Sequence, residues 1–96
     1  MKYFAEMDCV EKDMMKLARK AQEYDEAKRR DPDKYPNVLL PIHFLYKGLG
    51  KGIAVWEGND DQVARKVQFM LPEVEYTLTP IVDGRAYLKM YVEGKK

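Results

Sequence analysis

The chain contains no serine, one histidine and one cysteine, and these shortages exclude several kinds of enzyme. A Ser-His-Asp hydrolase is excluded because its nucleophile is missing. With only His43 and Cys9 beside the carboxylates, and no ligand spacing among them, we predict no metal site and no cofactor. A single cysteine also cannot form a disulfide within the chain, which is typical of a protein kept in a reducing compartment.

Long hydrophobic runs are also missing. The longest apolar stretch, Val38 to Tyr46, has nine residues and contains His43, whereas a membrane-spanning helix needs about 20 residues. No apolar leader follows Met1-Lys2, so the sequence has no sign of a secretory signal. We therefore expect a cytoplasmic protein with no membrane partner.

Neither sign of charge dominates, because 17 Lys and Arg residues face 16 Asp and Glu residues. A net charge of +1 argues against nucleic-acid binding driven by bulk charge. An RNA-binding sheet would need exposed aromatic residues flanked by basic ones. We expect no nucleic-acid partner.

The 96 residues are enough for one domain, 1–96, and their patterning predicts the order βαββαββ. Asp8 with Glu11, and Asn59 with Gln62, resemble capping boxes that begin the two helices, while Pro32 and Pro72 end them. Asp83-Gly84 predicts a hairpin turn. The predicted strands are Lys2–Asp8, Val38–Tyr46, Ile53–Trp56, Val74–Thr79 and Ala86–Val92.

The glycine-rich stretch Gly48 to Gly52 predicts a bend between two strands. A phosphate-binding loop opens into a helix, but here a β-branched and aromatic strand follows, Ile53 to Trp56. The spacing fits neither GxGxxG nor GxxxxGK[ST]. We therefore interpret these glycines as a hairpin connection in which glycine supplies a positive φ.

Two helices on one face of an antiparallel sheet make a two-layer α+β sandwich, and the other face should then be polar. The second strand does not alternate in this way. Apolar side chains occupy both of its faces: Val38, Leu40, Ile42, Phe44 and Tyr46 on the side predicted to meet the helices, and Leu39 and Leu45, with His43, on the other. Pro41 indicates an edge strand. We expect a second copy of the chain to cover the apolar helix-free face.

The segments MKYFAEMD, GIAVWEGND and VEYTLTPIVDG, each in its place relative to the helices, resemble the dimeric α+β barrel superfamily. That superfamily includes muconolactone-isomerase-like proteins and antibiotic-biosynthesis monooxygenases. The resemblance implies a ferredoxin-like fold, a homodimer or higher homo-oligomer, and a C-terminal strand near the partner. It transfers no activity, because the fold hosts many functions.

Strand alternation gathers a set of candidate site residues on the helix-free face. Glu6 and His43 form a candidate acid–base pair, because a carboxylate and an imidazole in a half-dry pocket can move protons at neutral pH. The alternative is structural: His43 satisfies a backbone carbonyl and Glu6 is a solvated or interface charge. The candidate ligand-binding residues are Phe4, Leu45, Trp56, Thr77 and Thr79.

Cys9 beside the first predicted helix would have a lowered thiol pKa, although it also fits a small core residue. Two functions follow from the whole pattern. One is a cofactor-free enzyme that binds or converts a small hydrophobic or aromatic molecule in the barrel. The other is a non-catalytic ligand-sensing or assembly module whose barrel is filled by side chains.

Overall fold

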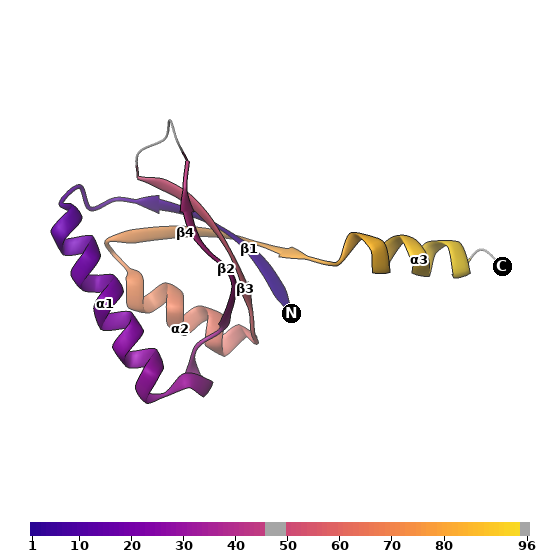
Figure 1. Cartoon of the computed structure of the whole chain (residues 1–96), viewed down its shortest axis with the longest axis horizontal. Coiled ribbons are helices and arrows are strands. Elements are labelled where there is room, and N and C mark those ends of the chain that lie inside the picture. The colour runs from indigo at the N-terminus through magenta and orange to yellow at the C-terminus, as the bar shows by residue number, and fades with distance from the viewer. Residues whose placement is uncertain (46–49, 95–96) are drawn as a thin grey trace.

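The computed structural model describes residues 1–45 and 50–94, which form four strands, three α-helices and a short 3-10 helix (Figure 1). The strands and helices follow the order βαββαβ, with a helix added after the last strand. In chain order they are β1 (Lys2–Cys9), α1 (Met14–Arg30), η1 (Pro32–Lys34), β2 (Asn37–Phe44), β3 (Lys51–Glu57), α2 (Asp60–Met70), β4 (Val74–Ile81) and α3 (Gly84–Gly94).

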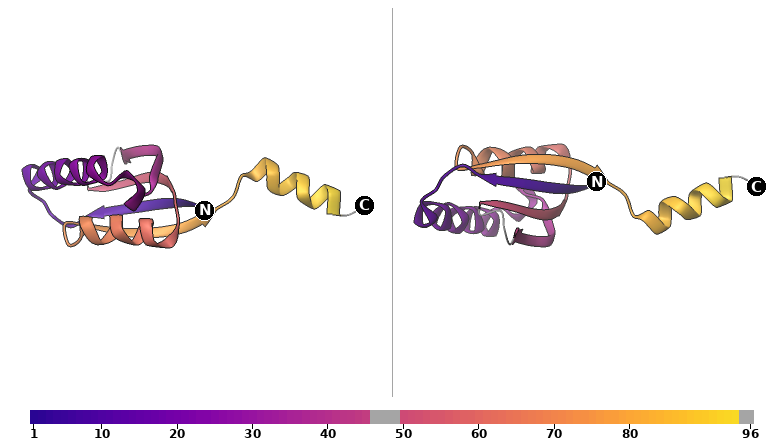
Figure 2. Two further views of the ribbon diagram at one scale, coloured as in Figure 1. Left: turned by 90° about the horizontal axis from the view of Figure 1, so that it is seen from below. Right: turned by 90° about the horizontal axis from the view of Figure 1, so that it is seen from above.

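All strand pairs are antiparallel, and the sheet has the order β2-β3-β1-β4. Helices α1 and α2 lie on the same face of this sheet, and α3 extends away from the end of β4 (Figures 1 and 2). This arrangement is α+β and compatible with a ferredoxin-like fold. It leaves one face of the sheet uncovered by any of the described helices.

The core lies between the sheet and the two helices. Alternate residues of β1 point into it, with Ala5, Met7 and Cys9 all buried. On β3, Ala54 lies opposite Ala5, and Trp56, opposite Tyr3, is only 1% exposed. Small residues at the centre of the sheet let the one large indole fit beneath the helices.

Helix α1 begins later than the sequence predicts. Asp8 still belongs to β1, and the cap is Asp13, whose carboxylate accepts a hydrogen bond of 2.9 Å from the Met15 amide. The Asp8–Glu11 capping box is therefore wrong: the Glu11 carboxylate accepts from the Asp13 amide instead, at 3.0 Å. Cys9 lies in the strand and is buried, and this burial raises the pKa of its thiol, so the lowered pKa that the sequence predicts is wrong.

The start of α2 is the one that the sequence predicts. Asn59 accepts a hydrogen bond from the Gln62 amide at 2.8 Å, and the Gln62 side chain accepts one from the Asn59 amide at 2.9 Å. The Gln62 amide group also donates to the Asp33 carbonyl, which ties α2 to η1. Gly58 precedes this box, and a Cβ there would lie 2.7 Å from the Gln62 side-chain oxygen. A larger residue would disturb the cap.

The predicted fifth strand, Ala86–Val92, is wrong, because these residues form α3. Asp83 does not open a hairpin: its carboxylate accepts from the Ala86 amide at 3.0 Å and caps the helix. An Asp-Gly pair fits a hairpin turn and a helix start equally well. A hairpin would form here only if the residues after Gly84 paired with a neighbouring strand.

Strand β2 is an edge strand, as Pro41 predicts, and it is irregular. Register shifts fall between Val38 and Leu40 and between Leu40 and His43. Leu40 consequently lies opposite Val55, on the helix-free face, and its predicted place beneath the helices is wrong. Of the glycine connection, residues 46–49 lie outside the described residues, while Gly50 has the expected positive φ of 87°.

Replacing Asn59 with Ala removes the hydrogen bond to the Gln62 amide at the start of α2. We expect the free energy of unfolding in urea to fall by about 1 kcal/mol. Gln68→Ala, an exposed change within the same helix, is the matched control and should lie within about 0.5 kcal/mol of the original chain. Equal stability of the two variants would contradict the importance of this cap.

Candidate functional site

The helix-free face carries one continuous row of paired residues across the sheet. His43 lies opposite Ile53, Ile53 opposite Glu6, and Glu6 opposite Thr77. In the adjacent row Phe4 lies opposite both Val55 and Thr79. A shallow hollow of about 480 Å³ covers part of this face, lined by residues that include Phe4, Glu6, Leu45, Ile53 and Thr77.

The strand register brings most of the predicted site residues to one face, but it does not join Glu6 to His43. One strand separates them, so their backbones are about 10 Å apart at the usual spacing of neighbouring strands. His43 instead makes a contact of 2.7 Å between its Nδ1 and the Pro41 carbonyl oxygen. A carbonyl can only accept, so Nδ1 carries the proton in this contact. Within one chain, His43 is an exposed histidine bonded to the backbone.

Trp56 does not lie on this face. It points toward the helices and is 1% exposed, because β3 places Gly52, Ala54 and Trp56 on the core side. Its predicted position among the barrel residues is therefore wrong. Leu45 and Thr79 remain exposed, at the β2 end and on β4 respectively.

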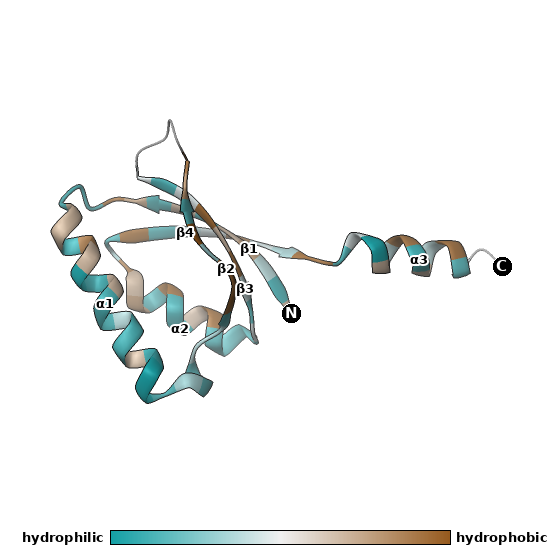
Figure 3. Cartoon of the chain, viewed as in Figure 1, coloured by the Kyte–Doolittle hydropathy of each residue, from teal (hydrophilic) through white to brown (hydrophobic). Residues whose placement is uncertain are grey.

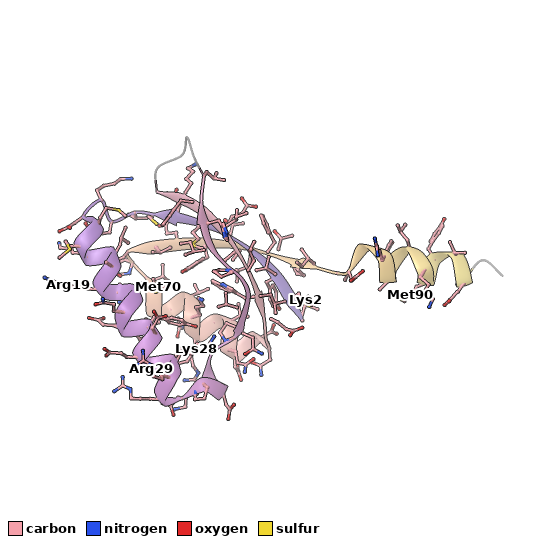
Figure 4. The ribbon with its side chains drawn as sticks, viewed as in Figure 1. Lys2, Arg19, Lys28, Arg29, Met70 and Met90 are labelled. Carbon is pink, nitrogen blue, oxygen red and sulfur yellow. The ribbon has the colours of Figure 1, made fainter. Side chains whose placement is uncertain are left out.

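A second hollow, which the sequence did not predict, lies on the opposite side of the sheet, between α1, α2 and β2. It measures about 290 Å³ and is mainly apolar, with Met7, Ile42, Trp56 and Met70 among its lining residues. Two of the lining residues, Lys28 on α1 and Met70 on α2, are labelled in Figure 4. We call this hollow the helix-side pocket.

Lys66 is the unusual residue of the helix-side pocket. Its ammonium nitrogen lies 4.5 Å from the centre of the Trp56 ring and 4.6 Å from that of Tyr24. Burial and, to a smaller extent, the nearby Lys28 charge together lower its pKa to about 8, against a small opposing effect of Asp25. Among the described residues no carboxylate forms an ion pair with it. The two rings thus partly replace water around the cation.

Tyr24 adds a second unpaired polar group to the same pocket. Its side chain is 5% exposed and packs edge-on against Tyr35 and Phe69. Its hydroxyl is buried, and it has no hydrogen-bond partner among the described residues. Burial raises the pKa of this hydroxyl, so it stays protonated and is a free donor at neutral pH.

A signal for Lys66 does exist in the sequence. It lies three residues after Val63 and four before Met70, and both of these are buried core residues of α2. A lysine at these helical spacings falls on the apolar face of the helix and not on the solvated one. The pocket itself could not be predicted, because it needs residues from α1, α2 and all four strands.

Among the described residues, no group of three or more His, Cys, Asp or Glu side chains is placed to hold a metal ion. None of the helices in residues 1–45 and 50–94 combines the length and the apolar character needed to cross a membrane. Comparison with known proteins finds no matching family model, no matching curated protein and no matching solved structure. The function is therefore inferred from the geometry of the helix-free face and of the helix-side pocket.

Replacing Lys66 with Met tests the unpaired cation. The pKa of Lys66 falls from 10.5 to about 8 on folding, so between these values the unfolded chain binds more protons and the original chain gains stability as pH rises. The variant lacks this gain and has no buried charge. We expect it to be more stable by about 1–3 kcal/mol near neutral pH, with a smaller difference near pH 9.5.

Urea unfolding at both pH values measures this difference, with the exposed Lys16→Met as the matched control. The charged and titratable groups that line the pocket around Lys66 are Tyr24, Asp25, Lys28 and Tyr76. They remain in both variants. A stability difference that does not depend on pH would contradict the desolvated state of Lys66.

Proposed function

We propose that the protein is a homodimer in which two helix-free faces pack together as an α+β barrel that binds a small hydrophobic or aromatic molecule. The apolar character of the uncovered face is the observation that carries this proposal. Phe4, Leu40, Ile53 and Val55 occupy its central strands and the adjoining edge, and all are only partly buried in the single chain. Such a surface is unfavourable in water.

A second copy is the occupant that fits this face best. The surface is one face of an antiparallel sheet, and its apolar side chains can meet those of a second copy related by a twofold axis, which is the arrangement of most homodimers. A face four strands wide and eight residues long covers roughly 500 Å² in plan, whereas a standard interface buries about 800 Å² per partner. Further contact area is therefore needed beyond the sheet.

Helix α3 can supply that further area. It exposes large apolar side chains, including Leu88, Met90 and Val92, each more than 60% exposed. In Figure 3 it carries hydrophobic residues although it lies apart from the core. It replaces the predicted C-terminal strand as the element that reaches the partner.

Binding is better supported than catalysis. The candidate acid and base, His43 and Glu6, lie on strands that are not neighbours, and His43 is bonded to the Pro41 carbonyl. The hollow beside Glu6 is lined by Phe4, Ile53 and Thr77. The charged side chains of Asp8, Lys51 and Glu75 also line it, so a ligand there would meet polar groups as well as the apolar Phe4 and Ile53.

Sedimentation velocity at micromolar concentration tests the assembly. We expect a dimer for the original chain and a monomer for Val55→Lys, because removing the charge of a lysine from water at the centre of the interface is costly. Val10→Lys changes an exposed apolar residue outside the face and should remain dimeric. A monomeric original chain, or a dimeric Val55→Lys, would overturn the proposed pairing.

Binding of N-phenyl-1-naphthylamine, an uncharged aromatic fluorophore, tests whether the barrel between the two sheets holds a ligand. We expect its fluorescence to rise with the original chain and to remain low with Val55→Lys, because the barrel forms only in the dimer. Val10→Lys again serves as the control. A dimer that leaves the dye unbound would favour the second candidate, an assembly module whose barrel is filled by its own side chains.

A further inference from the structure

We propose that the helix-side pocket is a binding site for a small organic acid, with Lys66 and Tyr24 holding its carboxylate and the apolar walls holding its body. The site lies on the other side of the sheet from the proposed barrel. The inference therefore does not rest on the proposed function, and either can fail without the other.

The charge of the pocket favours an anion. Lys66 and Lys28 contribute two positive charges and Asp25 one negative charge, so the lining groups sum to +1. The Lys28 ammonium already donates to the Pro36 carbonyl at 2.8 Å, whereas the Lys66 ammonium faces two aromatic rings. An anion that enters the pocket would meet a cation with hydrogen-bond capacity still unused.

The protonation states suit the same ligand. The Lys66 ammonium is mostly charged at neutral pH even though burial lowers its pKa to about 8. The buried Tyr24 hydroxyl is a neutral donor without a partner among the described residues. A carboxylate has two oxygens, and it can accept from a charged and from a neutral donor at once. One ligand group thus satisfies both orphaned groups.

The walls determine what the acid carries. Trp56 lies beneath Lys66, and Tyr76 packs against Trp56 with 5.0 Å between ring centres. Met7, Ile42 and Met70 add flexible apolar surface. With about 290 Å³, the pocket is at the small end of ligand sites, which usually measure roughly 300–1,000 Å³. A single-ring aromatic acid fits this description, and a nucleotide or a sugar phosphate does not.

Trp56 is the only tryptophan of the chain and forms part of the pocket, so its fluorescence reports on the site directly. Titration with benzoate should change this emission in a saturable way. Benzyl alcohol, which keeps the ring but lacks the charge, should bind at least about tenfold more weakly, because hydrogen bonds to charged groups are worth about 1.5–3 kcal/mol.

Two variants separate the roles of the donors. Lys66→Met should weaken benzoate binding at least about tenfold, and Tyr24→Phe by about threefold to tenfold. Lys16→Met removes the same charge from an exposed position of α1 outside the pocket and should bind benzoate as the original chain does. Circular dichroism confirms that each variant is folded before titration.

Three results would overturn the inference. These are the absence of saturable benzoate binding up to millimolar concentration, equal affinity for benzyl alcohol, and an unchanged affinity in folded Lys66→Met. None of them depends on whether the chain sediments as a dimer or binds the uncharged dye. Conversely, benzoate binding by the monomeric Val55→Lys would support the pocket even if the barrel proposal failed.

Discussion

The sheet has helices on one face only, and the rest of the structure depends on this asymmetry. On the covered face, small side chains of β1 and β3 leave room for Trp56 beneath α1 and α2. On the uncovered face, Phe4, Ile53 and Val55 form the centre of an apolar surface with no layer above it from any described helix. A chain of 96 residues buries little surface by itself. A second copy over this face would supply the burial that the single chain lacks.

On the covered face, two polar groups, the Lys66 ammonium and the buried Tyr24 hydroxyl, have no hydrogen-bond partner among the described residues. Lysine is rarely buried without a paired anion, because removing its charge from water is costly. Lys66 reaches this state against Trp56 and Tyr24, whose rings attract the cation but provide no hydrogen-bond acceptor in line with it. The Tyr24 hydroxyl is in a similar state. Two unsatisfied polar groups in one pocket lower the stability of the chain, and they are the groups that a carboxylate would satisfy.

Local signals in the sequence were enough to predict the fold as far as β4. The Asn59–Gln62 box and the edge position of Pro41 each follow from hydrogen-bonding capacity within a few residues. Alternation also places Glu6 and Thr77 on one face, where the register pairs them. The alternation rule failed in β2, where bulges move Leu40 to the other face. The turn prediction failed at Asp83, whose carboxylate caps a helix, because no neighbouring strand favours a hairpin there. The spacing of Lys66 from Val63 and Met70 indicates its place on the apolar face of α2, but its pocket comes from elements far apart in the chain and could not be predicted.

The exposure of the helix-free face to solvent is the most direct test of the account. Methyl resonances can be followed by NMR while a soluble, uncharged paramagnetic compound is added to the protein. We predict that the methyl resonances of Ile53 and Val55 stay sharp while those of Val82, which is 74% exposed, broaden. Equal broadening of all three residues at the same protein concentration would show that water reaches the face, and would contradict the proposed second layer.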